Sequence, residues 1–248
     1  MNPMMISCRY LTAIFVTICA TAAAGQDQVV TLQRQQEMSC EVESRFQCNF
    51  LLYLPPQYEE LEKHPLLLFL HGAGERGNND LDLVKVHGPA KLIAAGKQFP
   101  FIVVSPQCKA GSWWDATELS ALLDHMEANY KVDKRRIYVT GLSMGGYGTW
   151  ALAFRESQRL AAIAPICGGG NMIAARYTKS ITTPTWAFHG GKDTVVPLSK
   201  SQEMIDVLKQ NKIEAKLTVY EDAGHDSWTQ AYNNEELYEW LLAHQREG

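Results

Sequence analysis

One stretch of fifteen residues, Ile137 to Ala151, constrains the fold more than any other part of the sequence. A short apolar segment runs into a Gly141-x-Ser143-x-Gly145 turn, and small residues typical of a helix start follow. In this strand–turn–helix order the turn is too sharp for side chains beside the serine, so glycine is needed on both sides. The pattern therefore predicts Ser143 as an exposed nucleophile, with the amide of Met144 at the positive end of a helix as an oxyanion donor.

Apolar segments alternate with amphipathic ones along the rest of the chain. The continuous apolar run 65–70 is typical of a strand that is buried on both faces, as in a parallel sheet. We expect an α/β fold: a doubly wound, mostly parallel sheet with helices on both faces. The expected strands are 28–37, 46–54, 65–70, 101–105, 137–142, 160–166, 185–188 and 215–220, and the expected helices are 81–95, 117–130, 199–210 and 234–244.

The first 24 residues have the pattern of a secretory signal peptide. Arg9 is the only charged residue before the apolar stretch 10–20, and small residues up to Gly25 favour cleavage after Ala24. We expect a secreted or periplasmic protein whose single domain spans 25–248, with no stable membrane insertion after cleavage. The alternative is an uncleaved anchor, although the apolar stretch is short for a membrane span. The sequence does not indicate an oligomeric state.

Composition excludes one class of partner and raises a question about the thiols. The net charge of −4 leaves no basic footprint, so a nucleic-acid partner is not expected. Four cysteines follow residue 24, and an exported protein favours disulfides, here Cys40 with Cys48 and Cys108 with Cys167. The alternative is four buried free thiols.

A serine nucleophile needs a base within hydrogen-bond reach and an acid that orients the base. In folds that carry the serine on such a strand–turn–helix turn, the chain order is serine, then aspartate or glutamate, then histidine. Asp193 follows the strand 185–188 and His225 follows the strand 215–220, so both should lie at the carboxyl edge of the sheet with Ser143. Asp222 and Asp226 are rival acids, but both share a loop with His225, which makes the geometry awkward.

Two other histidines, His71 and His189, each lie at a strand-to-loop corner before glycine, which favours a structural role. The glycine-rich loop after the strand 65–70 should supply the second oxyanion amide. Ala73 is the first choice for that amide and Gly74 the alternative, and Glu75 and Arg76 could pair to brace the loop.

With these motifs together, the chain resembles the α/β-hydrolases, in particular the carboxylesterase/phospholipase and dienelactone-hydrolase branch. It is similar to secreted bacterial esterases labelled predicted peptidases, which share features with the prolyl-oligopeptidase catalytic domain. The motifs are His71-Gly-Ala-Gly-Glu-Arg-Gly77, Gly141-Leu-Ser-Met-Gly-Gly146, His189-Gly-Gly-Lys-Asp193 and Gly224-His-Asp-Ser-Trp228. The resemblance implies Ser143 as nucleophile, Asp193 as acid, His225 as base, and the amides of Ala73 and Met144 as the oxyanion hole.

The resemblance and the motifs together predict a serine esterase that forms an acyl-enzyme on carboxylic esters. No Cys-x-x-Cys or His-Glu-x-x-His spacing occurs, so neither a metal nor another cofactor is expected. One alternative is a serine peptidase of the prolyl-oligopeptidase type, which would use the same three residues. A second alternative is a non-catalytic binding protein on a hydrolase scaffold, and the intact set of motifs argues against it.

The sequence also limits what can cover the site. The segment 167–184 is too short for a helical cap domain, so we expect an open cleft that suits small acyl groups, with a small-molecule or saccharide ester as the partner. Trp113, Trp114 and Trp228 lie in loops at the same edge and could bind substrate by stacking. The alternative is that these tryptophans only anchor the packing.

Overall fold

The structure is a computed structural model, and it describes residues 46–172, 175 and 181–247. Contacts divide the chain into residues 1–46 and 47–248, and the fold reported below is that of the second unit. The expected signal peptide, the first expected strand (28–37) and Cys40 lie outside the described residues. Among those residues, no helix combines the length and the apolar character needed to cross a membrane.

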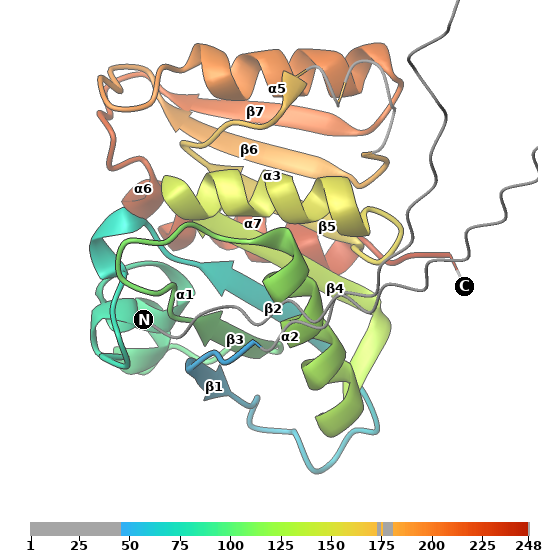
Figure 1. The fold of residues 1–248 in the computed structure, drawn as a ribbon. Coiled ribbons are helices and arrows are strands. Elements are labelled where there is room, and N and C mark those ends of the chain that lie inside the picture. Colours follow the sequence, from blue (N-terminus) through green and yellow to red (C-terminus); the bar gives the residue numbers. More distant parts are fainter. Residues whose placement is uncertain (1–45, 173–174, 176–180, 248) are drawn as a thin grey trace, which may run out of the picture. The chain divides into compact units, whose positions relative to one another are not determined.

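A seven-stranded sheet forms the centre of this unit (Figure 1). The strand order is β1-β3-β2-β4-β5-β6-β7, and β1 is antiparallel to β3 while all other neighbours are parallel. This confirms the expected doubly wound, mostly parallel sheet. The strands are β1 (Phe50–Tyr53), β2 (His64–Leu70), β3 (Ile102–Pro106), β4 (Val132–Leu142), β5 (Ala162–Ile166), β6 (Thr185–Gly190) and β7 (Ala215–Tyr220).

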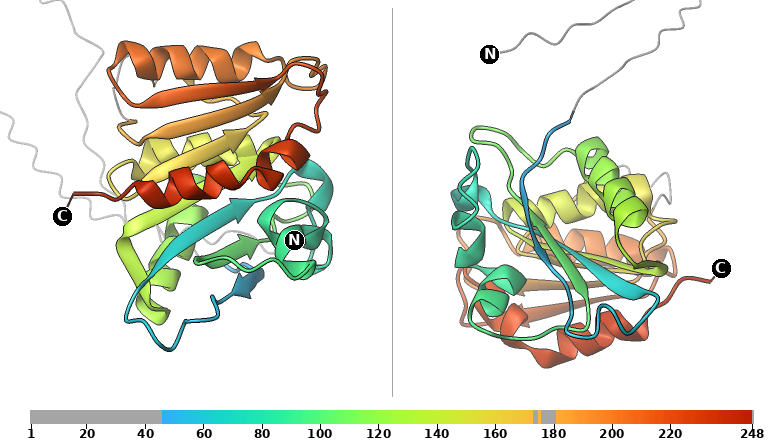
Figure 2. Two further views of the ribbon diagram at one scale, coloured as in Figure 1. Left: turned by 180° about the vertical axis from the view of Figure 1, so that it is seen from behind. Right: turned by 90° about the horizontal axis from the view of Figure 1, so that it is seen from below.

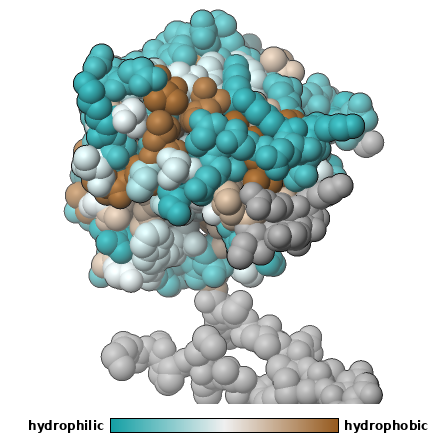
Figure 3. All heavy atoms as spheres, turned by 90° about the horizontal axis from the view of Figure 1, so that it is seen from above, coloured by the Kyte–Doolittle hydropathy of each residue, from teal (hydrophilic) through white to brown (hydrophobic). Residues whose placement is uncertain are grey.

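Helices cover both faces of the sheet (Figures 1 and 2). One face carries α2 (Ala116–Asn129), α3 (Met144–Glu156) and α5 (Ser199–Gln210). The other carries α1 (Gly88–Ala94), α6 (Trp228–Asn233) and α7 (Glu235–Ala243), with α7 lying across the back of the sheet. The outer side of α5 is polar, and the face of the molecule seen from above is mainly hydrophilic, with a band of apolar residues across it (Figure 3).

Two helical expectations were too simple. The expected helix 81–95 divides into a 3-10 helix, η2 (Leu83–Val86), and α1. Gly88 has a φ of +65° and packs against the Phe69 ring, so the chain must bend there. At the C-terminus α6 precedes α7, and the Asn234 side chain caps α7 by accepting a hydrogen bond from the amide of Glu236.

The central strands provide the apolar core. Every residue of β2 is buried, and Leu66 to Leu70 are fully inaccessible to solvent, which explains the uninterrupted apolar run in the sequence. Burying one such side chain contributes about 1.5–3 kcal/mol relative to leaving it exposed. This rigid centre fixes the loops that leave the carboxyl ends of the strands.

The expected Cys108–Cys167 disulfide is wrong, because both residues are buried free thiols. Cys108 follows β3 and Cys167 follows β5, and the strand order places β2 and β4 between them. Three strand spacings amount to about 14 Å, well beyond the roughly 7 Å that a disulfide can bridge between Cα atoms. Cys48 is also a free thiol, and its expected partner Cys40 lies outside the described residues.

The order in which strands are added to the sheet changes side at β2. After β2 the chain adds β3 on one side, and then it returns to add β4 on the other side of β2. Open α/β sheets bind ligands outside the carboxyl ends of the strands at such a switch point. The loops that follow β2 and β4 are the glycine-rich loop and the serine turn, so the fold places both at this crevice.

The serine turn packs directly on the end of β2. A Cβ on Gly145 would collide with the Leu70 backbone carbonyl, and a Cβ on Gly141 would collide with the Gly145 carbonyl. Backbone atoms of the core cannot move aside as a flexible side chain can. The two glycines flanking Ser143 are therefore required by packing as well as by the sharpness of the turn.

We predict that Gly145→Ala lowers the free energy of unfolding by about 2 kcal/mol or more, because overpacking a rigid core typically costs about 1–3 kcal/mol. Urea unfolding followed by circular dichroism measures this. Gly74→Ala is the matched control: nothing lies within 4 Å of a Cβ at Gly74, so its stability should stay within about 0.5 kcal/mol of the wild type. Equal effects of the two substitutions would contradict the close approach at Gly145.

Candidate active site

Ser143 lies on a strained turn between β4 and α3. Its backbone has a φ of +52° and a ψ of −115°, a conformation that non-glycine residues rarely adopt. The amide of Ser143 donates to the Ile166 carbonyl at 2.9 Å, which ties the turn to the end of β5. Met144 follows as the first residue of α3, where backbone amides have no partner within the helix. The local structure is the one that the sequence motif predicted.

His225 bridges Ser143 and Asp193. Its Nε2 lies 2.9 Å from the Ser143 Oγ, and its Nδ1 lies 2.8 Å from the Asp193 Oδ2. A carboxylate only accepts hydrogen bonds, so Nδ1 carries the proton and Nε2 is left free to accept one. The structure thus brings together, from loops after β4, β6 and β7, the three residues that the sequence placed at one edge.

Asp193 is held in its ionised form. Burial alone would raise its pKa, but hydrogen bonds to the carboxylate outweigh burial and the pKa is lowered. The donors are His225 and the amides of Val196 and Val195, both of which lie 2.9 Å from Oδ1. One carboxylate oxygen is therefore fixed by its own loop, and the other is directed at the imidazole.

The two rival acids have other partners. Asp222 is exposed and pairs with Lys192 at 2.6 Å, and Asp226 accepts a hydrogen bond from the amide of Thr229 at 3.1 Å. Neither replaces Asp193 at the Nδ1 of His225, which fits the chain-order argument.

His189 braces the loop that carries Asp193. The ring is fully buried, and its Nε2 donates to the Val196 carbonyl at 2.9 Å while lying 3.4 Å from the Asp193 Oδ2. Its Nδ1 lies 2.7 Å from the Ser201 hydroxyl on α5. Burial lowers the pKa of His189, so the ring stays neutral near pH 7. The structural role expected for His189 is confirmed. The sequence did not predict that this role includes holding Asp193 in place.

His71 holds the glycine-rich loop that follows β2. Its Nδ1 donates to the Gly72 carbonyl at 2.6 Å, and its Nε2 accepts from the amide of Cys108 at 3.0 Å. Burial lowers the pKa of His71 to about 4, so both bonds persist at neutral pH. The loop continues into a 3-10 helix, η1 (Ala73–Glu75), which begins at the residue expected to supply the second oxyanion amide.

Arg76 and Glu75 do not brace the loop by pairing with each other, contrary to expectation. The Arg76 guanidinium donates instead to the carbonyls of Ala73, at 2.9 Å, and Ser112, at 3.2 Å. Glu75 is buried beneath the loop, and its carboxylate lies 3.8 Å from His87. Arg76 therefore joins two loops through backbone carbonyls. Because every residue has a backbone carbonyl, the sequence does not show which ones accept these hydrogen bonds.

The three tryptophans have different environments. Trp113 is 62% exposed and meets Tyr147 edge to face, with ring centroids 6.5 Å apart. Trp114 is anchored, because its indole N–H donates to the His71 carbonyl at 3.1 Å. Trp228 packs edge-on against the imidazole of His225, with the ring centroids 5.2 Å apart. Trp113 is free to adjust to a ligand, Trp114 is fixed in place, and Trp228 supports His225.

A cavity of about 270 Å³ lies beside the nucleophile turn. Met144 and Tyr147 from α3 form one wall, Trp113 and Trp114 form another, and Phe154 lies on α3 further along. The lining is mostly apolar and aromatic, as is typical of small-molecule sites. Tyr147 and Phe154 were not among the predicted site residues, although their spacing on the helix that begins at Met144 would have placed them on one face.

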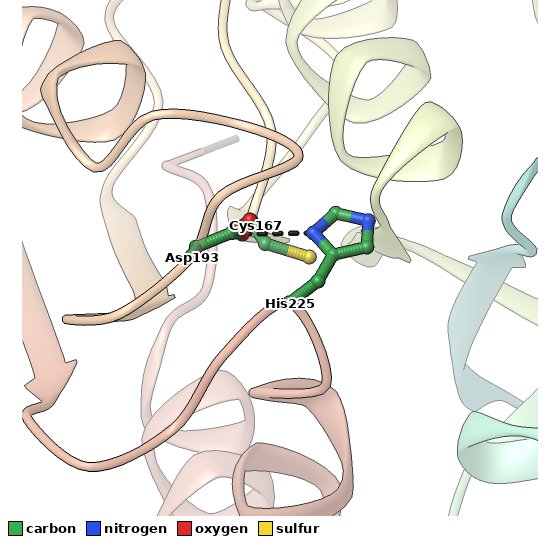
Figure 4. Close-up of side chains that lie close together, drawn as sticks. All are labelled: Cys167, Asp193 and His225. Carbon is green, nitrogen blue, oxygen red and sulfur yellow. Dashed lines mark hydrogen bonds and ion pairs between the residues drawn. The ribbon is translucent and has the colours of Figure 1, made fainter.

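Cys167 also lies at this site. Its thiol, the Asp193 carboxylate and the His225 imidazole lie close together (Figure 4). In the sequence Cys167 stood out only as one half of an expected disulfide.

Comparisons with known proteins identify the family of this chain. The chain belongs to the dienelactone hydrolase family, whose model matches residues 114–238. It is 30% identical over 192 residues to the bifunctional acetylxylan esterase/xylanase of Neocallimastix patriciarum, covering 71% of this chain and 26% of that protein. It is 29% identical over 135 residues to poly(3-hydroxyalkanoate) depolymerase C of Paucimonas lemoignei, covering 48% and 31%.

Solved structures point to the same class. The structure of a thermostable esterase superimposes with a TM-score of 0.66 and 31% identity, covering 79% of this chain and 59% of the other. The fold is also that of an acylaminoacyl peptidase from Pyrococcus horikoshii, with a TM-score of 0.60 and 18% identity, covering 83% and 41%. The chain spans about a third or less of the two curated relatives. These findings place the chain among the α/β-hydrolases, alongside relatives named as esterases.

The lowered pKa of Asp193 leads to a prediction about stability in acid. Ionised Asp193 stabilises the fold above the unfolded pKa, about 3.9, and this contribution is lost as the pH falls through the lower pKa of the folded state. Asparagine cannot titrate, so the free energy of unfolding of Asp193→Asn should fall less steeply with acid than that of the wild type. Urea unfolding between about pH 6 and about pH 3 measures the slope.

The exposed Asp222, paired only with Lys192, offers the control. Asp222→Asn should keep the wild-type slope, because exposed ion pairs contribute little to stability. A wild-type slope in Asp193→Asn would contradict the lowered pKa.

Proposed function

We propose that this protein is a serine esterase that forms an acyl-enzyme at Ser143. The observation that carries the proposal is the continuous chain of hydrogen bonds from Ser143 through His225 to Asp193, at 2.9 Å and 2.8 Å, on a strained turn at the switch point of the sheet. The turn presents the hydroxyl, and the imidazole supplies the base that a neutral serine requires. Membership in a family of esterase-type hydrolases supports the same chemistry.

The proposed reaction has two halves. Ser143 Oγ attacks the ester carbonyl carbon while His225 Nε2 takes the hydroxyl proton, and the carbonyl electron pair moves onto oxygen. The amides of Met144 and Ala73 would stabilise this oxyanion. When the intermediate collapses, the alcohol leaves with the proton from His225 and the acyl group stays on Ser143. Water then attacks in the same way, releasing the acid and restoring the Ser143 hydroxyl.

Asp193 would act on the imidazole rather than on the substrate. It fixes the tautomer with the proton on Nδ1 and stabilises the positive charge that His225 gains in each half-reaction. His189 and the amides of Val195 and Val196 hold the carboxylate in place for this task. No metal or other cofactor takes part in the proposed steps.

For the substrate we propose small acyl groups on a small or saccharide alcohol. The cavity beside Met144 is about 270 Å³, below the usual range of roughly 300–1,000 Å³ for drug-sized ligands. Exposed Trp113 at its edge offers a flat face on which a sugar or an aromatic group could stack. The acetylxylan esterase relative bears a name that fits this substrate class.

We further propose that the protein acts outside the cytoplasm. The pattern of residues 1–24 favours export and cleavage after Ala24, leaving the catalytic domain in 25–248. The mature protein would then be secreted or periplasmic.

The catalytic roles predict distinct losses of activity on a chromogenic acetyl ester. Ser143→Ala should fold normally and lose on the order of a million-fold in kcat, and His225→Ala should lose about as much, because nucleophile and base act as a unit. Asp193→Asn should lose somewhat less, and Asp222→Asn should retain wild-type kcat. Wild-type turnover in Asp193→Asn together with a large loss in Asp222→Asn would overturn the acid assignment.

The substrate proposal predicts a preference for short acyl chains. Turnover should decline from acetyl towards long-chain esters, with no jump in rate above the micelle threshold, and peptide amides should be turned over far more slowly than esters. Trp113→Ala should raise KM for acetylated sugars by up to about tenfold with little change in kcat, as expected for one lost stacking contact. Trp240→Ala, away from the cavity, is the control and should keep the wild-type KM.

Three results would contradict this substrate class: interfacial activation with long chains, a faster rate on amides than on esters, or an unchanged KM in Trp113→Ala across all sugar esters.

A further inference from the structure

Three side chains that can bind a metal lie close together at the base of the active site. Cys167, Asp193 and His225 come from the loops after β5, β6 and β7 and each offers one ligand atom, and these atoms all lie within 4.8 Å of one another. Figure 4 shows the thiol directed at the side of the imidazole that meets the Asp193 carboxylate. Because three separate loops supply them, no metal-binding spacing is visible in the sequence.

The proposed ester hydrolysis leaves the Cys167 thiol without a task. The side chain is fully buried, on a backbone with a φ of +39° that its amide stabilises by donating to the Phe188 carbonyl at 2.8 Å. Burial raises the pKa of Cys167 to about 12, although the Ser143 amide and the Ser227 hydroxyl work against this rise. The thiol is therefore protonated near neutral pH, and a nearby cation would be needed to ionise it.

A fourth polar group lies beside the thiol. Ser227 is fully buried beside the Cys167 thiol, and among the described residues its Oγ meets no oxygen or nitrogen partner. Because sulfur is only a weak hydrogen-bond partner, this buried hydroxyl remains available to a cation. Together with the nearby Asp226 carboxylate, which also acts on the thiol, this hydroxyl makes the pocket attractive to a cation.

We propose that Cys167, Asp193 and His225 form a binding site for one Zn²⁺ or similar thiophilic divalent cation, and that occupancy switches the hydrolase off. Cysteine sulfur, histidine nitrogen and aspartate oxygen are the ligands that zinc prefers. Zn²⁺ with one thiolate and one carboxylate has no net charge, so the filled site avoids an unbalanced charge in the interior. Ser227 Oγ or a water molecule would complete the tetrahedron.

The switch would work through the tautomer of His225. The cation would take the Nδ1 lone pair, so the imidazole proton moves from Nδ1 to Nε2, and the Cys167 thiol releases one proton to solvent. An Nε2 that carries a proton donates to Ser143 and cannot accept its hydroxyl proton. Nucleophilic attack then stops. The inhibition rests on the proposed esterase function, but the metal binding does not.

The geometry needs only a small adjustment. Tetrahedral zinc with sulfur at about 2.3 Å and nitrogen or oxygen at about 2.0–2.2 Å places its ligands roughly 3.5 Å apart. Ligand atoms up to 4.8 Å apart would close by about 1.3 Å or less, and His225 Nδ1 and Asp193 Oδ2, which lie 2.8 Å apart, would separate by roughly 0.6 Å. The His225 side chain is 21% exposed, which gives the cation a route into the site.

The first experiment is inhibition of ester hydrolysis by ZnCl₂ in the full mature chain. Wild-type activity should be lost on adding Zn²⁺ and should return on adding EDTA, whereas EDTA alone should not lower the rate. With activity normalised to each variant's own metal-free rate, Cys167→Ala should need at least about 100-fold more Zn²⁺ than the wild type for half-inhibition. Even outer-sphere partners of zinc ligands contribute about 10–100-fold in affinity. Cys108→Ser, which removes another buried thiol, should be inhibited like the wild type.

The affinity for zinc should also depend on pH through the Cys167 thiol. Because the proposed binding releases the thiol proton, zinc affinity should rise steeply with pH between about pH 6 and about pH 7.5. The steep rise should be absent in Cys167→Ala. The titratable groups that face the thiol are His225, Asp193, Asp226, Tyr147 and Tyr232.

A second readout needs no activity. Titration with Co²⁺ should give a thiolate-to-metal absorption band in the wild type, in Cys108→Ser and in Ser143→Ala, but not in Cys167→Ala. If the protein hydrolyses no ester, the band still tests the site. A band of equal strength in Cys167→Ala, or inhibition of Cys167→Ala at the wild-type zinc concentration, would overturn the proposal. So would the absence of any band in the wild type.

Discussion

The close approach of the serine turn to the end of β2 is the constraint on which the rest of the site depends. Gly145 contacts the Leu70 carbonyl with no room for a side chain, and this contact presses α3 against the sheet. Ser143 is left in a conformation that costs about 1–3 kcal/mol, which the buried core around it must supply. The hydroxyl is thereby presented at the start of a helix whose first amides have no partner within the helix.

From that fixed point the parallel sheet determines the remaining geometry. Parallel strands all end at the same edge, so the loops after β2, β4, β5, β6 and β7 gather around one crevice although they are up to about 150 residues apart in sequence. Two buried neutral histidines brace this assembly: His71 holds the glycine-rich loop, and His189 holds the loop of Asp193. Both rings are kept neutral by burial, so the support does not change near neutral pH.

Much of this could be predicted from the sequence because it depends on local rules. The apolar run that became β2, the Gly-x-Ser-x-Gly turn and the order of Ser143, Asp193 and His225 each have a local chemical reason. Other features were not predictable because residue spacing does not encode strand order or the path of a loop. The separation of Cys108 from Cys167 follows from strand order, and the Arg76 bond to the Ser112 carbonyl joins two loops. The support of Asp193 by His189 is local, but it depends on how the loop between them turns. The same reason hid the cluster around Cys167, whose three members lie in different loops.

The central claim is that Ser143 carries the acyl group during turnover, and trapping that intermediate tests it most directly. When the enzyme is mixed rapidly with an excess of a chromogenic acetyl ester, it should release a burst of alcohol close to one equivalent per active site. Acid quenching during the burst, followed by peptide mass analysis, should find one acetyl group on the peptide that contains Ser143, and none in Ser143→Ala. Turnover without any covalent adduct, or an acetyl group on Cys167 in place of Ser143, would contradict the account.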